Sequence, residues 1–97
     1  MTTSDLKVPV RPLHVEIDGA GRYRQAFCVD DLAALLMGGW PPSAKTNPAF
    51  HRALATSLDA MELYVDAETA REAFVHAAHT AGMHVLPDDM AEMRKAG

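Results

Sequence analysis

Residues 66–82, with the sequence DAETAREAFVHAAHTAG, predict the helix against which the other segments of this chain pack. Its apolar residues recur at steps of three and four, which is the spacing of one face of an α-helix. These residues are Ala67, Ala70, Phe74, Ala77 and Ala81. Asp66 can cap the first turn, and Gly82 can end the helix in the left-handed conformation. Because the inner face consists of alanines around one phenylalanine, neighbouring elements can approach it closely.

Residues 13–29 predict a β-hairpin, since two segments of alternating polarity flank the turn sequence DGAG. In the second segment we expect Phe27 on the buried face, together with Tyr23 and Val29. Arg22 and Arg24 are then expected on the outer face. Gln25 interrupts the apolar face, which leaves room for a bulge that shifts the register.

Two more helices are expected between the hairpin and the central helix. Residues 32–37 predict a short one, and Asn47 followed by Pro48 predicts the start of another that runs to about residue 61. Trp40 lies between them, before two prolines, and is expected to pack over the edge of the core. The alternative is an exposed aromatic side chain that contacts a ligand or partner.

The expected fold is α+β in the order β-β-α-α-α-β, a small antiparallel sheet packed on three helices. Residues 83–86 supply its third strand, because a lone hairpin is marginal in water. One domain is expected at residues 10–87, between a flexible arm (1–9) and a flexible or frayed tail (88–97) whose Asp88 and Asp89 are interpreted as tail charge. The predicted core consists of Leu13, Val15, Ile17, Tyr23, Phe27, Leu32, Leu35, Leu36, Trp40, Phe50, Leu54, Leu58, Phe74, Ala77 and Val85.

Composition restricts the class of protein. The chain has 97 residues, a net charge of -4 and one cysteine, which fit a single soluble domain in a reducing compartment. We find no signal-peptide pattern and no apolar run of membrane-spanning length, so a cytoplasmic protein without membrane contact is expected. The acidic total also disfavours nucleic acid as a partner.

Three segments together resemble a known family. They are Pro12-Leu13-x-Val15, Trp40-Pro41, and the helical pattern Ala70-Arg71-x-x-Phe74-x-x-Ala77-Ala78-x-x-Ala81-Gly82. Over residues 10–86 the chain looks like the small alphaproteobacterial, largely rhizobial, domain-of-unknown-function family 982. It departs from the family pattern at Ser57, where many members carry cysteine, and near Leu63, where they carry glycine. The resemblance implies a compact α+β domain in a bacterial cytosol, and it implies no catalytic residues.

Two groups of residues have side chains that could carry chemistry. His76 and His79, with Glu72 one turn earlier, could hold a divalent metal, but solvated histidines on an exposed helix face are the favoured interpretation. Cys28 could be a nucleophile, but no signature surrounds it, and a small buried cysteine is favoured. We therefore predict no catalytic residue, no metal ligand and no cofactor.

Arg71 is the charged residue of greatest interest. It lies next to the apolar stripe of the central helix, so its stem can cover the core edge while its guanidinium reaches Glu68. A structural ion pair, or a link to the compact apolar connector at residues 63–65, is favoured over an anion site. Together with Trp40, Arg22 and Arg24, it completes the set of predicted ligand or partner contacts.

These observations favour a non-enzymatic binding or regulatory module that acts through protein–protein contacts, for instance as a homodimer paired through a sheet edge. One alternative is a nucleic-acid-associated regulator that uses the basic outer face of the hairpin. A small metal-dependent enzyme is a third and weaker hypothesis.

Overall fold

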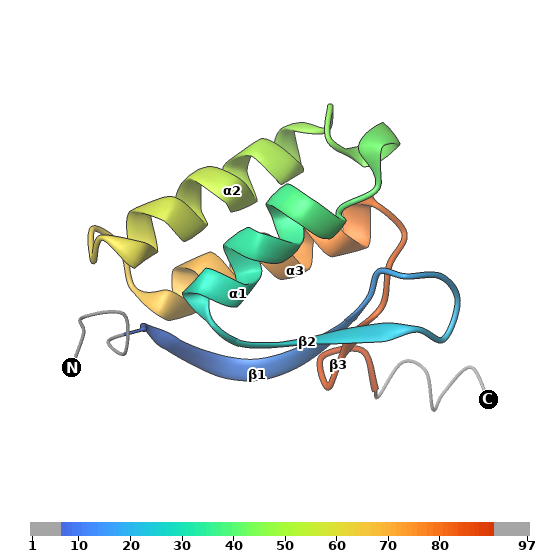
Figure 1. Cartoon of the computed structure of the whole chain (residues 1–97), viewed down its shortest axis with the longest axis horizontal. Coiled ribbons are helices and arrows are strands. Elements are labelled where there is room, and N and C mark those ends of the chain that lie inside the picture. Colours follow the sequence, from blue (N-terminus) through green and yellow to red (C-terminus); the bar gives the residue numbers. More distant parts are fainter. Residues whose placement is uncertain (1–6, 91–97) are drawn as a thin grey trace.

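The computed structural model describes residues 7–90 and shows three helices on one face of a small antiparallel sheet (Figure 1). The elements are β1 (Pro9–Glu16), β2 (Tyr23–Cys28), α1 (Val29–Ala34), a π-helical segment (Leu35–Gly39), a short 3₁₀ turn (Pro42–Ala44), α2 (Pro48–Met61), α3 (Ala67–Thr80) and β3 (Val85–Leu86). The sheet order is β2-β1-β3, with both neighbours antiparallel to β1. The predicted α+β class and element order are confirmed. None of the helices within residues 7–90 is long and apolar enough to cross a membrane.

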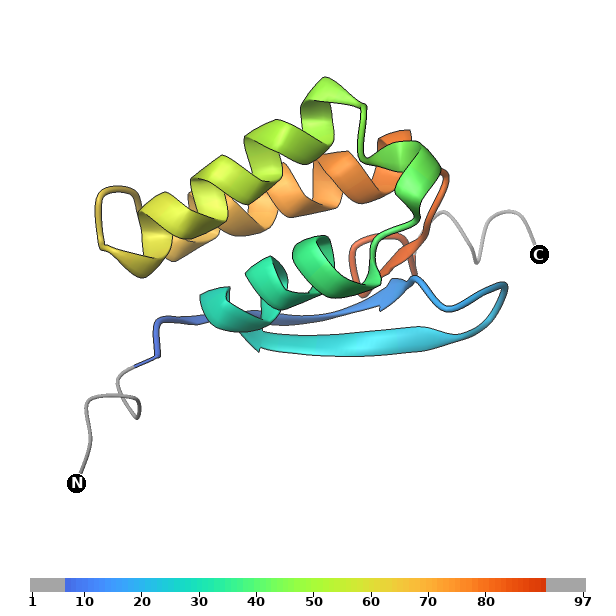
Figure 2. The same ribbon diagram turned by 45° about the horizontal axis from the view of Figure 1, so that its top comes forward.

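The central helix α3 begins and ends as its sequence predicts. The Asp66 carboxylate accepts hydrogen bonds from the backbone N–H of Thr69 at 2.9 Å and from its hydroxyl at 2.6 Å. Gly82 follows with φ +80°, a left-handed conformation that favours glycine. The middle of its alanine face is buried, at Ala70, Ala77 and Ala78, and α2 and α1 both pack against α3. Figure 2 shows α2 running alongside α3, with α1 nearer the sheet. Local signals were sufficient to predict this element.

Helix α1 begins earlier than predicted, at Val29, directly after β2. A carboxylate oxygen of Asp31 accepts the backbone N–H of Phe27 at 2.8 Å, so the chain turns from strand to helix without a loop. The helix then continues through a π-helical segment to Gly39. The predicted short helix is therefore present, but it begins three residues before the predicted range 32–37 and ends two residues after it, at Gly39.

The faces of β2 are the reverse of those predicted. Leu13 pairs with Ala26, and both are fully buried, whereas Phe27 is 52% exposed. Val15 pairs with Arg24, so Arg24 lies on the helix side of the sheet and not on its outer face. A small residue opposite Leu13 leaves room for the helices, which explains why alanine and not phenylalanine points inward.

Trp40 packs at the centre of the core. It is 3% exposed, with its ring centroid 5.3 Å from that of Phe74 and 6.2 Å from that of Phe50. The alternative of an exposed Trp40 is therefore wrong. Most of the predicted core is buried, but Leu58 is 45% exposed and Leu54 only half-buried, because α2 turns its smaller residues inward.

The two predicted terminal segments extend beyond the described residues. Residues 1–6 and 91–97, within the predicted arm and tail, lie outside them. Nearer the domain, the carbonyl of Val8 accepts the backbone N–H of Val29 at 2.8 Å, and β1 already begins at Pro9. The ordered sheet therefore starts earlier than the predicted first strand.

Candidate functional site

Arg71 on α3 is 1% exposed and bonds the backbone of β1 at the part of that strand that β3 does not cover. Its Nε donates to the carbonyl of Arg11 at 2.8 Å, and its two terminal nitrogens donate to the two carboxylate oxygens of Asp88, each at 2.8 Å. Glu68, the partner predicted for Arg71, pairs instead with the side chain of Arg11. The interpretation of Asp88 as tail charge was therefore wrong, as was the predicted pairing with Glu68.

This arrangement gives Arg71 a structural role. Strand β3 pairs only with His14 and Val15 of β1, and Arg71 bonds the β1 backbone beyond the end of that short strand. The Arg71 guanidinium holds the pKa of the Asp88 carboxyl below its usual value. A cleft of 360 Å³ lies beside this pair. It is lined by Arg11, Glu68, Arg71, Glu72, Val75, His76, His79 and Asp88.

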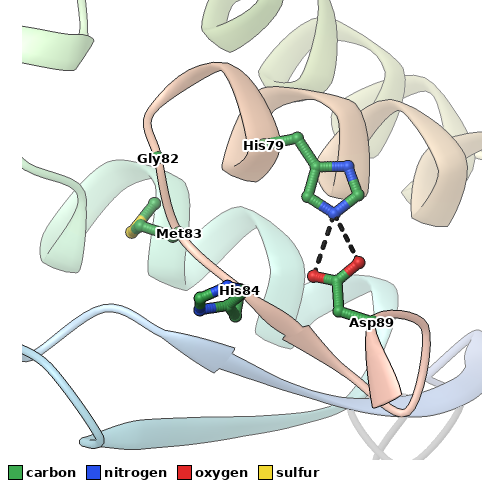
Figure 3. Close-up of a pocket in the computed structure, with 5 residues that line it drawn as sticks. All are labelled: His79, Gly82, Met83, His84 and Asp89. Carbon is green, nitrogen blue, oxygen red and sulfur yellow. Dashed lines mark hydrogen bonds and ion pairs between the residues drawn. The ribbon is translucent and has the colours of Figure 1, made fainter. Parts of the chain in front are cut away.

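A neighbouring cleft of 310 Å³ contains a histidine–aspartate pair (Figure 3). His79 Nε2 lies 2.9 and 3.0 Å from the two carboxylate oxygens of Asp89, which is 8% exposed. One of these oxygens also accepts the backbone N–H of Val85 at 2.6 Å. Asp89 therefore closes the turn after β3, and its interpretation as tail charge was wrong. His79 is half-exposed but is not simply solvated.

The second histidine of this cleft belongs to a different pair. His84 Nδ1 lies 3.2 Å from a carboxylate oxygen of Glu16 on β1, and its ring lies apart from His79 and Asp89 (Figure 3). The pKa of Glu16 is lowered mainly by the backbone N–H of Gly21, which donates to it at 2.7 Å, and further by His84. The two histidines thus orient two separate carboxylates.

The chemistry of these groups is limited. Within residues 7–90 no three histidine, cysteine or carboxylate side chains gather closely enough to hold a metal ion. Cys28 is buried, and burial raises the pKa of its thiol, which opposes formation of the nucleophilic thiolate. What the clefts do hold is a set of ion pairs and hydrogen bonds that join α3 to the sheet and to the turn after β3.

The four residues predicted as ligand or partner contacts do not come together. Trp40 is in the core and Arg71 is at the β3 edge of the sheet. Arg22 is exposed just before β2, and Arg24 forms an exposed ion pair with Asp18 at 3.5 Å. They therefore form no common site.

A group of exposed apolar side chains lies instead at the end of α2 and in its connection to α3. Four large apolar side chains are exposed there, and we call them the apolar corner. They are Leu58 (45%), Met61 (39%), Leu63 (76%) and Tyr64 (75%). The corner lies at one end of the helical layer (Figure 1). Sequence reasoning missed it, because it assigns Leu58 to the core and treats residues 63–65 as a compact connector between two predicted helices.

The backbone at this corner is also unusual. Leu63 has φ +65°, and it is the only residue other than glycine with positive φ among residues 7–90. Its N–H donates to the carbonyl of Ala60 at 3.0 Å, and the N–H of Tyr64 donates to that of Asp59 at 2.9 Å. The corner is thus a tight, hydrogen-bonded end of α2 that projects apolar side chains.

The architecture defines a small α+β domain in which three helices cover one face of a three-stranded antiparallel sheet. The model of the family described as "Protein of unknown function (DUF982)" matches residues 11–85, and the chain belongs to this family. No curated protein and no solved structure matches the chain.

Proposed function

We propose that this protein is a non-enzymatic binding module of the bacterial cytosol, which acts through protein–protein contacts at the apolar corner. The observation that carries the proposal is Leu63, a leucine in the left-handed region with 76% of its surface exposed.

Folding gains little from leucine at this position. A side chain with a Cβ at positive φ costs about 1–2 kcal/mol, whereas glycine adopts that conformation without strain. The cost is not offset by burial, since most of the Leu63 side chain lies in solvent. Strained residues with no packing role concentrate at functional sites.

The neighbours of Leu63 extend this surface. Tyr64 is equally exposed, and Leu58 and Met61 lie on successive turns of α2 beside it. Clustered apolar side chains on a small domain mark interaction sites, and tyrosine and methionine are enriched in interface cores. The corner therefore has the composition of a contact surface.

The test compares retention of partners by three tagged full-length chains in a lysate of the source cells. We expect Leu63→Gly to lose the proteins retained by the wild type, while its urea midpoint stays unchanged or rises because glycine suits φ +65°. Met37→Ser is the matched control, since it removes another exposed apolar side chain (59%), located after α1.

The control should retain the same proteins as the wild type in quantitative mass spectrometry. If Leu63→Gly retains them too, or if no protein is retained specifically by the wild type, the proposed function is wrong.

A further inference from the structure

We infer that the partner of the apolar corner presents apolar side chains flanked by lysine or arginine, in the manner of a basic amphipathic segment. This inference rests on the proposed function and adds the chemistry of the partner.

In the stretch of sequence that contains the corner, all charged side chains are acidic. Residues 53–70 contain four acidic side chains and no lysine or arginine. Two of the four already have partners, since Asp66 caps α3 and Glu68 pairs with Arg11. Asp59 and Glu62 are exposed, have no side-chain partner among residues 7–90, and lie among the apolar residues in sequence, Asp59 directly after Leu58 and Glu62 between Met61 and Leu63. We call these two carboxylates the acidic rim of the corner.

An acidic rim selects among the classes of partner. A symmetric contact with a second copy would bring the same patch, with Asp59 and Glu62, against itself, and like charges placed together oppose association. Anionic nucleic acid or phospholipid is repelled for the same reason. Basic side chains are attracted by both carboxylates, so they complement the rim while leucine-like side chains cover the corner.

The experiment uses two synthetic amphipathic helical peptides that share one leucine face and differ only in their flanking residues, lysine in one and glutamate in the other. Amide chemical shifts of the isotope-labelled full chain report the binding site and the affinity. We expect the lysine peptide to bind on the order of tenfold more tightly. It should shift the resonances of residues 58–64, and added salt should weaken it.

Charge-reversed variants make the test specific. Asp59→Lys with Glu62→Lys should reverse the preference between the two peptides. Asp18→Lys with Glu72→Lys changes the net charge equally, at the hairpin turn and on α3, and should leave the preference as in the wild type.

The inference is overturned if neither peptide shifts residues 58–64, or if the preference survives reversal at Asp59 and Glu62. It is also overturned if the control pair abolishes the preference equally, or if the wild type dimerises through the corner. None of these results contradicts the proposed function if Leu63→Gly loses the proteins that the wild type retains. If Leu63→Gly retains those proteins, both the proposed function and this inference are wrong.

Discussion

Ser57 is fully buried in α2, and its hydroxyl has no hydrogen-bond partner among the described residues. Burying an unsatisfied hydroxyl costs about 1–3 kcal/mol, and alanine also has the higher helix propensity. We therefore expect Ser57→Ala to raise the free energy of unfolding by about 1 kcal/mol. Urea denaturation measures this change. Thr56→Ala is the control, because it gains the same helix propensity but removes a hydroxyl that already donates to the carbonyl of Arg52 at 2.6 Å, so it should stabilise the protein less than Ser57→Ala does.

Among the charged residues, Arg71 is the one whose replacement should lower the free energy of unfolding most. Lysine can keep the charge but cannot bond both Asp88 oxygens and the Arg11 carbonyl at once. We expect Arg71→Lys to lower the free energy of unfolding by about 2–3 kcal/mol, since the contacts are buried. Arg11→Lys, in an exposed pair, should cost less than about 1 kcal/mol. Equal losses in the two variants would contradict the structural role of Arg71.

Ser57 and Leu63 are two positions at which another residue would fit the backbone or the core better. Cysteine in place of Ser57 would bury a weaker hydrogen-bonding group, and glycine in place of Leu63 would suit the left-handed backbone. Both residues carry a folding cost in this chain, and only Leu63 places an apolar side chain on the surface.

At the scale of elements, the turn after β3 depends on charged contacts with α3. Because Arg71 lowers the pKa of Asp88 in the folded state, this pair stabilises the protein above the ordinary aspartate pKa of about 4. The stabilisation is lost as the pH falls through the lower, folded-state pKa. We expect Asp88→Asn to be less stable than the wild type at neutral pH, with a difference that shrinks below about pH 4.

Urea titrations across this pH range measure that difference. Other carboxylates with lowered pKa values, such as Glu16 and Glu68, contribute to both proteins and cancel in the comparison. A difference that is independent of pH would show that Asp88 acts by packing and not by charge.

At the level of the whole molecule, β2 forms one edge of the sheet. The predicted homodimer could form by pairing two copies along this edge. The Asp31 carboxylate bonds the backbone N–H of Phe27, which removes one donor from that edge. Pairing of two copies along β2 stays a prediction, and Asp31 opposes it. We expect Asp31→Ala to increase self-association, measured as solution mass against concentration by light scattering. A wild type that already dimerises as strongly as the variant would refute this role of Asp31.

The sequence predicted features that depend on neighbouring residues better than features that depend on contacts between distant segments. The limits of α3 follow from apolar spacing, Asp66 and Gly82, which act within one helical turn. The face of β2 could not be read in the same way, because Phe27 and Ala26 both fit a strand. Only the space available opposite Leu13 decides which of them points inward.

The candidate site shows the same limit. Leu58, Leu63 and Tyr64 are apolar, and composition alone assigns such residues to a core or a connector. Their exposure depends on how α2 packs its small residues against α1 and α3. The sequence did contain one signal, because residues 53–70 include no lysine or arginine. That signal points to a binding surface only once the corner is known to be exposed.

Local sequence patterns were enough to predict the α+β class, the order of the elements and the central helix, because periodicity, caps and turn residues act over a few neighbouring positions. The tertiary structure alone decided that Arg71 pairs with Asp88 and bonds the backbone of β1, about sixty residues earlier in the chain. It also decided that Leu63 and Tyr64 face solvent. Such outcomes depend on which distant segments compete for the same buried space and the same hydrogen-bonding groups, and local patterns hold no information about that competition.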